Sequence, residues 1–265
     1  MFNDKHLSYS FKKAAAMVAQ SKKMKFPFLA GSSLPVTWRM PDLELPYGCE
    51  IEQALMVGVG SSDSSDYHAL EALQGMIERR KGGETGIARV QLIEGQDVWK
   101  AGEQGCYSID LLAAALARNE IVKGKSLVDA RTQDLLKDNE LRRIVPKPAL
   151  YSIEHRDGLK TSLLMLNGAV GDLSFAAKLK GKKEIQSNVF YLPPKPNVTY
   201  SACLANKIEE MIVTGKAPYP VERTLLVSGL LESCLDSKVQ GHKSLATPHL
   251  KVSYMAPKKS NHCRA

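Results

Sequence analysis

Apolar residues recur at intervals of three and four in five segments of the chain, which predicts amphipathic helices. In the first segment Phe11, Ala14 and Val18 fall near one face, and a serine at position 8 or 10 can cap the helix. Glycines close the second segment at Gly82 and Gly83. The predicted helices cover residues 8–24, 67–80, 108–118, 200–214 and 221–240.

Short apolar or alternating runs bounded by turn residues predict the strands. The first follows the first predicted helix, an order typical of an α/β layer. Later strands follow one another directly, and Arg156-Asp157-Gly158 is a hairpin turn between two of them. Consecutive antiparallel strands after an α/β start predict an α+β fold. The predicted strands cover residues 26–30, 54–60, 87–93, 149–155, 160–166, 172–179 and 185–192.

A stretch rich in Ser, Pro and Gly, from Gly31 to Gly48, marks the expected crossing between two domains. The last residues, SYMAPKKSNHCRA, predict a flexible basic tail. We therefore expect a first unit over 1–40, a second over 41–252 and a tail over 253–265.

The composition, 44% hydrophobic and 24% charged in 265 residues, is that of an ordinary soluble protein. No apolar run approaches the roughly 20 residues of a membrane helix. The start, MFNDKHLSYSFKK, lacks an apolar signal core, so we expect a cytoplasmic location and no membrane contact.

A net charge of +8 raises the question of nucleic-acid binding. The basic residues are mostly dispersed, and no aromatic RNA-binding signature or zinc-finger spacing accompanies them. Solvated basic loops, or attraction for a phosphorylated cofactor, explain the charge more economically. Nucleic-acid binding stays a secondary alternative.

The five cysteines are scattered and contain no CxxC pair. This spacing argues against a zinc knuckle and against a disulfide framework, and we predict no metal site. Cys203 and Cys234 fall within helical apolar patterns, so we expect them to be small buried apolar side chains.

The loop Gly58-Val59-Gly60-Ser61-Ser62-Asp63 lies between a predicted strand and a predicted helix. A dinucleotide fingerprint requires a third glycine where Asp63 stands, and a carboxylate there has the wrong sign for a pyrophosphate. No better match occurs elsewhere in the chain. The sequence therefore predicts that this loop does not bind a nucleotide.

Two positions carry candidate chemistry. Lys5, in Asn3-Asp4-Lys5-His6-Leu7, would follow a strand end, where active crevices of open α/β sheets lie, and could donate to a substrate hydroxyl. His68 could act as a base with a carboxylate nearby, and on a helix it shares a face with Glu71. The alternatives are a surface charge for Lys5 and an ordinary capped helix start around His68.

In order along the chain, these pieces resemble the Gfo/Idh/MocA (glucose–fructose oxidoreductase and inositol dehydrogenase) family. The Lys5 turn, with the helix and FPFLAGSS after it, is similar to that family's passage out of its Rossmann domain. His68 and Glu71 match two positions of the family's acid–base motif. Ser64 stands where the family has Asp, so Asp63 or Asp66 would have to substitute. Residues 207–241 resemble the closing helix pair.

The resemblance implies a Rossmann remnant followed by a large, mostly antiparallel sheet packed by helices on one face. It further implies NAD or NADP, and oxidation of a CH–OH group of a sugar or polyol-like substrate. Lys5 would contact cofactor and substrate, and His68 would be the base, aided by Asp66 or Asp63. Trp38 and Arg39 are weaker candidates for substrate contact. The open sheet face would form a homo-oligomer.

Everything before the Lys5 turn of that family, including its glycine fingerprint, has no counterpart here. We therefore expect a fragment, or a relic that has lost redox chemistry, inactive as it stands. The alternative hypothesis is a non-catalytic binding or oligomerisation protein derived from the second domain.

Overall fold

An eight-stranded mixed sheet lies at the centre of the computed structural model, which describes residues 1–60, 62–119, 135–136, 139–193 and 199–264. Its strand order is β10-β5-β6-β7-β4-β8-β9-β3, and only β4 and β7 pair in parallel. The predicted large, mostly antiparallel sheet is confirmed. The strands are β3 (Trp38–Met40), β4 (Ile51–Gly58), β5 (Ile87–Glu94), β6 (Ala149–His155), β7 (Lys160–Met165), β8 (Leu173–Leu179), β9 (Gln186–Tyr191) and β10 (Leu245–Ala246).

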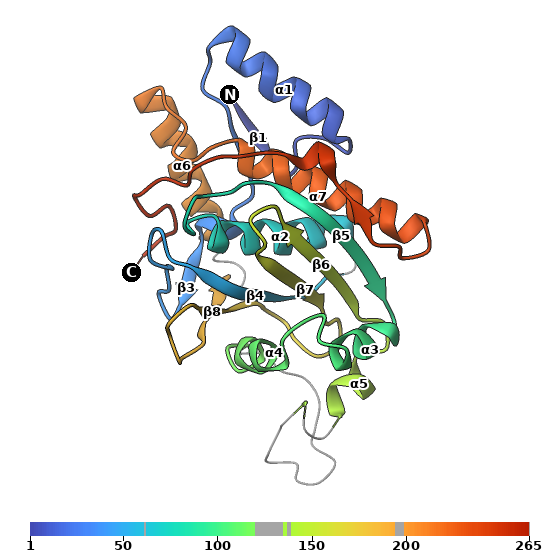
Figure 1. Cartoon of the computed structure of the whole chain (residues 1–265). Coiled ribbons are helices and arrows are strands. Elements are labelled where there is room, and N and C mark those ends of the chain that lie inside the picture. The colour runs from blue at the N-terminus through green and yellow to red at the C-terminus, as the bar shows by residue number, and fades with distance from the viewer. Residues whose placement is uncertain (61, 120–134, 137–138, 194–198, 265) are drawn as a thin grey trace.

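A second, two-stranded sheet stands at the N-terminal end of the chain (Figure 1). Strand β1 (Phe2–Asp4) pairs in parallel with β2 (Leu29–Gly31), and helix α1 (Phe11–Met24) connects them. The hydroxyl of Thr224 donates to the carbonyl oxygen of Ala30 in β2 at 2.9 Å. This bond ties the small sheet to helix α7 (Glu222–Val239), which lies over the large sheet.

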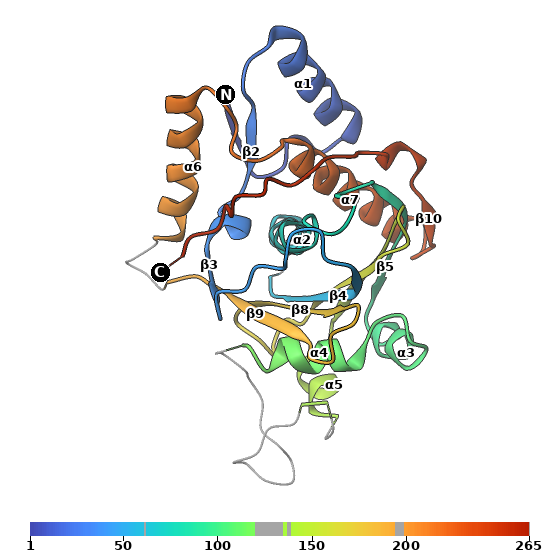
Figure 2. The same cartoon turned by 60° about the vertical axis from the view of Figure 1, so that its left-hand side comes forward.

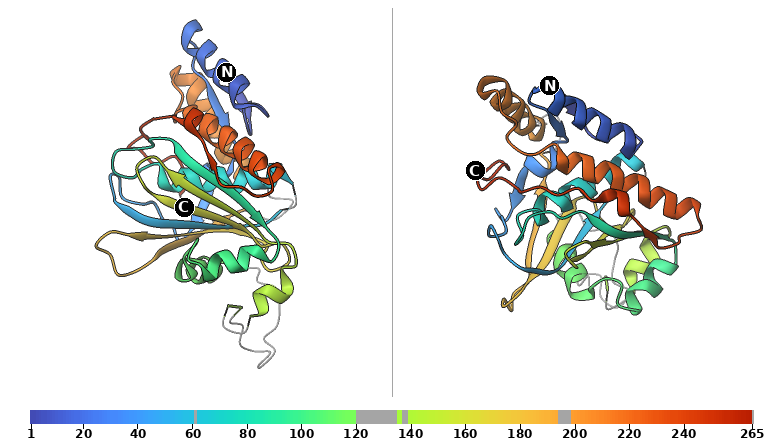
Figure 3. Two further views of the ribbon diagram at one scale, coloured as in Figure 1. Left: turned by 45° about the vertical axis from the view of Figure 1, so that its right-hand side comes forward. Right: turned by 45° about the horizontal axis from the view of Figure 1, so that its top comes forward.

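Helices pack against both faces of the large sheet, so the expectation of helices on one face is wrong (Figure 3). Strand β4 shows why, because successive side chains point to opposite faces. Ala54 and Met56 belong to the core around helix α2 (Asp63–Ile77) and α7. Leu55 and Val57 belong to a second core with α3 (Asp97–Glu103), α4 (Ile109–Leu116) and α5 (Glu140–Ile144).

Helix α2 lies between the large sheet and α7, and Figure 2 views it end-on. All of its residues from Ala69 to Ile77 are buried. Its polar members therefore need partners inside the protein. Glu78, just after the helix, accepts bonds from the buried guanidinium of Arg223 at 2.8 and 2.5 Å.

The C-terminal segment is not a frayed tail, contrary to the prediction. Tyr254, Ala256 and His262 are buried, and the backbones of Tyr254 and Glu84 exchange hydrogen bonds. The chain from residue 253 to 264 runs back over the molecule to the N-terminal part (Figure 2). Cys203, in helix α6 (Tyr200–Thr214), is buried as expected but forms a disulfide with Cys263. The cysteine spacing gave no hint of this pair.

Candidate functional site

The turn after β1 brings Lys5 to the start of helix α2. Lys5 has a left-handed backbone (φ 62°), and its N–H donates to the Gly31 carbonyl at 3.2 Å. The hydroxyl of Tyr67 on α2 lies 3.4 Å from the Lys5 carbonyl oxygen. The Lys5 side chain is exposed. The backbone of the turn is thus fixed from both strand and helix, while the ammonium group is left free to meet a ligand.

His68 is the second predicted site residue, and the structure places it near Lys5. The imidazole is half-buried on α2, and burial lowers its pKa. The positive charges of Lys5 and His6 lower the pKa further, against an opposing effect of Asp4. Its Nδ1 atom is buried, with no hydrogen-bond partner among the described residues. A neutral imidazole has one ring nitrogen that can accept a proton, so His68 has the chemistry of a base.

Asp66 does not join His68. Residues two positions apart on a helix are rotated by about 200° about the helix axis, so these two side chains point to nearly opposite sides. The Asp66 carboxylate accepts a hydrogen bond from the Tyr151 hydroxyl at 2.5 Å, and burial raises its pKa. Asp63 is exposed one turn earlier and acts electrostatically on Asp66. The structure therefore offers no support for either aspartate as the helper of His68.

Glu71 fixes the position of the helix that carries His68. It is buried, and its Oε2 accepts from the N–H of Ser32 at 2.9 Å and from the Ser32 hydroxyl at 2.6 Å. The hydroxyl of Tyr67 lies 3.4 Å from its Oε1. Burial raises the pKa of Glu71 to about 7, against the opposing effect of the Ser32 bonds. The motif match pointed to this residue, but its burial makes it a positioning residue.

Trp38 and Arg39, the predicted substrate contacts, line the same cavity but differ in burial. Trp38 is half-buried and lines a cavity of about 450 Å³. The guanidinium of Arg39 is buried and donates to the carbonyls of Leu43 at 3.0 Å and Pro35 at 3.2 Å. Burial lowers the pKa of Arg39 to about 10. The residues that line this cavity include neither Lys5 nor His68.

The loop between β4 and α2 does not fit a dinucleotide. The N–H of Gly60 is already used, donating to Asn167 Oδ1 at 2.7 Å. Asp63 and Asp66 stand in the first turn of the helix, where two carboxylates repel a pyrophosphate. In addition β4 is an inner strand of the large sheet, between β7 and β8. The described residues of this loop, which exclude Ser61, therefore do not form a nucleotide cradle.

No described helix combines the length and the apolar character needed to cross a membrane. Within the same residues, no three or more His, Cys, Asp or Glu side chains gather where a metal ion could be held.

No family model and no curated protein sequence matches this chain. Solved structures do match it. GenD2 from gentamicin A biosynthesis, in complex with NAD, gives a TM-score of 0.56 at 11% identity, over 93% of this chain and 71% of that one. Myo-inositol dehydrogenase from Lactobacillus casei, in complex with NAD(H) and myo-inositol, gives a TM-score of 0.51 at 9% identity, over 93% of this chain and 70% of that one. An oxidoreductase from Agrobacterium radiobacter, in complex with NAD+, L-tartaric acid and magnesium, gives a TM-score of 0.52 at 11% identity, over 92% of this chain and 72% of that one.

Sequence identities this low show a shared fold and nothing more. The agreement nevertheless extends over more than nine-tenths of the chain. The chain therefore has the fold of the Gfo/Idh/MocA-type oxidoreductases, as its sequence predicted.

Proposed function

We propose that this chain forms the substrate side of an NAD(P)-dependent oxidoreductase site for a CH–OH group of a sugar or polyol-like molecule. One observation supports the proposal: Tyr67, the neighbour of His68 on α2, reaches the carbonyl oxygen of Lys5, and the charge of Lys5 acts on the half-buried imidazole of His68. Two of the similar structures are of proteins whose names or ligands point to polyols and hydroxy acids, myo-inositol and L-tartaric acid.

The two side chains have complementary roles in this proposal. The ammonium of Lys5 donates to the substrate oxygen and favours a developing negative charge on it. His68 accepts the hydroxyl proton, because its lowered pKa keeps the imidazole neutral. Glu71 and Tyr67 hold the helix against the strand, so that the imidazole keeps its distance from Lys5.

A nicotinamide, when bound, would supply the hydride acceptor. The described residues do not form its pyrophosphate site, so no hydride step is derived for this chain. We expect the chain as it stands to bind a polyol without oxidising it. A cytoplasmic location and a homo-oligomer built through the sheet stay predictions.

Ligand titration tests the proposal. Calorimetry with myo-inositol and a small set of sugars should show binding to the wild-type chain. His68→Gln should weaken that binding by about tenfold or more, the size expected for one lost hydrogen bond to a polar ligand. His249→Gln serves as the matched control, because His249 is exposed and contacts Ser233 on α7. Absence of any polyol binding, or equal weakening by both variants, would refute the assignment.

The second candidate is a non-catalytic binding protein, favoured by the unsuitable loop after β4. Fluorescence titration with NADH and NADPH distinguishes the two. We expect no saturation in the micromolar range, and absorbance of reduced nicotinamide should stay constant with NAD or NADP and myo-inositol. Micromolar binding together with turnover would establish the enzyme and exclude the second candidate.

A further inference from the structure

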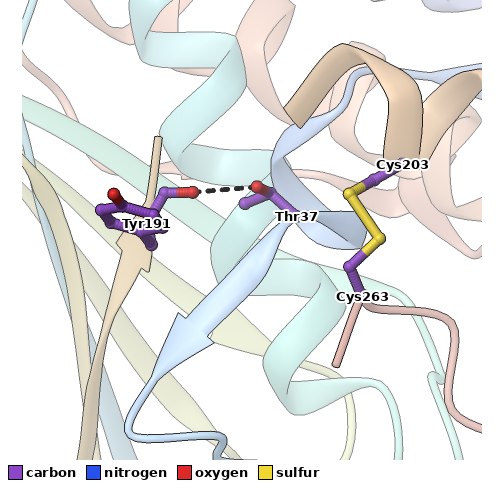
Figure 4. The surroundings of a disulfide bond; sticks show 4 residues. All are labelled: Thr37, Tyr191, Cys203 and Cys263. Carbon is purple, nitrogen blue, oxygen red and sulfur yellow. Dashed lines mark hydrogen bonds between the residues drawn. A yellow bond between two sulfur atoms is a disulfide. The ribbon is translucent and has the colours of Figure 1, made fainter. Parts of the chain in front are cut away.

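The Cys203–Cys263 disulfide joins helix α6 to the last residues of the C-terminal segment (Figure 4). The two cysteines are 60 positions apart, and their Cα atoms are separated by 6.1 Å, within the usual range for a disulfide. Cys203 is buried, whereas Cys263 is half-buried. The pair lies beside the start of β3, where the Thr37 hydroxyl donates to the carbonyl oxygen of Tyr191 at 2.9 Å.

Residues 260–264, which we call the latch segment, form one wall of the 450 Å³ cavity. Cys263 and Arg264 line it together with Trp38 and Tyr191. Trp38 and Tyr191 are paired residues of neighbouring strands, so their rings stand on the same side of the sheet. The cavity is thus bounded by a fixed aromatic pair on one side and by the end of the chain on the other.

Besides the disulfide, the latch segment is held by the buried His262 and by polar contacts. The N–H of Cys263 donates to the Val36 carbonyl at 2.8 Å. His262 Nε2 lies 2.6 Å from Asp42 Oδ1, and Arg264 reaches Glu44 at 3.0 Å. The side chains of Asp42 and Arg264 are about half exposed, 48% and 50%, so the ion pair between these two contributes little in water.

The residues just before the latch segment are anchored independently. Tyr254 is buried, and its hydroxyl donates to Glu78 at 2.9 Å. The guanidinium of Arg79 donates to the Pro257 carbonyl at 2.8 Å. Release of the disulfide would therefore free the latch segment without freeing the chain before it.

We propose that the Cys203–Cys263 disulfide is a redox latch that closes the Trp38 cavity, and that thiol–disulfide exchange opens it. A small thiol, as its thiolate, attacks the sulfur of Cys263, the less buried of the two residues, and displaces Cys203 as a thiolate, which takes up the proton. A second thiol attacks the mixed disulfide and leaves Cys263 reduced. The two small thiols become one small disulfide, and the protein disulfide becomes two thiols.

The placement of the two sulfurs favours a switch over a permanent cross-link. Cys263 is only half-buried, and it lies next to the end of the chain, where Arg264 is exposed and makes a half-exposed ion pair. In reducing compartments disulfides are rare, and those that occur are mostly transient or redox-sensing. The inference does not depend on the role proposed for His68.

The experiment compares the oxidised and reduced chain. After equilibration with oxidised glutathione, peptide mapping without reduction should recover the Cys203–Cys263 pair. Dithiothreitol should then speed hydrogen exchange of residues 260–264 by about tenfold or more and leave the strands of the large sheet unchanged. In a Trp99→Phe background, which leaves Trp38 as the single tryptophan, acrylamide quenching should rise on reduction.

Two variants fix the interpretation. Cys263→Ser should give the open behaviour whether or not an oxidant is present, and Cys106→Ser, which removes an exposed free thiol, should respond like the wild-type chain. Failure to form the linked peptide, or equal exchange and quenching in both states, would overturn the proposal. Loss of protection throughout the large sheet would also overturn it, since the bond would then support the whole fold.

Discussion

Glu71→Gln should change how the stability of the protein depends on pH. The pKa of the buried Glu71 carboxyl is raised from its ordinary value of 4.5 to about 7. Between these two pH values the folded chain keeps a proton that the unfolded chain has lost. The free energy of unfolding of the wild-type chain therefore falls as pH rises through that window. Above the upper pKa, the contribution of Glu71 to this free energy no longer changes with pH.

The size of the effect follows from the same two values. A difference between 4.5 and about 7, at about 1.4 kcal/mol per pH unit, gives about 3 kcal/mol for a group that is fully buried. Glutamine cannot ionise, and its side-chain oxygen can still accept the two bonds from Ser32. The variant should therefore be the more stable protein above the window and should lose this advantage below it.

Urea unfolding of both proteins at a series of pH values from below 4.5 to above 7 measures the difference. Other titrating groups, His68 among them, are common to both chains and cancel. Glu209→Gln, at an exposed position of α6, is the control and should run parallel to the wild-type chain. A constant difference between wild type and Glu71→Gln across the window would refute the reasoning.

Two further variants test the packing behind the site. Glu78→Ala leaves the buried guanidinium of Arg223 without its carboxylate and should cost about 3–5 kcal/mol in urea unfolding, whereas the more exposed Glu222→Ala should cost about 0–1 kcal/mol. Gly31→Ala places a methyl group against the Glu71 carboxylate at a residue with φ of +123°, and should lower stability by about 1–3 kcal/mol in the same assay. Equal effects of the two glutamate variants, or an unchanged stability for Gly31→Ala, would count against the described contacts.

Most of the helices and strands could be predicted because their apolar periods are local properties of the sequence. Helix α6 and strand β6 have the predicted bounds, and the Asp157-Gly158 turn joins β6 to β7 as expected. The start of α2 was placed too late, at Tyr67. The helix begins at Asp63, because Ser62 caps it and carboxylates in the first turn stabilise a helix N-terminus. The spacing of apolar residues does not contain this information.

Elements that depend on distant partners could not be predicted. Strand β3 is three residues long within a stretch rich in Ser and Pro, and it exists through pairing with β9, some 150 positions later. The C-terminal residues have a composition typical of a tail. Their order comes from partners elsewhere, such as Gln74 for Tyr254 and Cys203 for Cys263.

The candidate site was predicted in part, and helix geometry explains the division. The turn at Lys5 lies against the first turns of α2, where Tyr67 reaches the Lys5 carbonyl oxygen, and the role of Lys5 and His68 in one site stays a prediction. The predicted pairing of Asp66 with His68 conflicts with helix geometry, because residues two positions apart on a helix point to nearly opposite sides. The side chain of Asp66 points instead toward the core beneath α7, where only the folded structure reveals its partner, Tyr151.

Helix α2 is buried over most of its length, and each of its polar residues has a different neighbour. Glu71 bonds to the loop after β2, Gln74 to Tyr254, and Asp66 to Tyr151 of β6, whereas the Nδ1 atom of His68 has no partner among the described residues. Buried polar atoms are nearly always satisfied in folded proteins. The unpartnered ring nitrogen of His68 is therefore an exception on this helix, and it belongs to a side chain on which the charge of Lys5 acts, which is why we propose the site there.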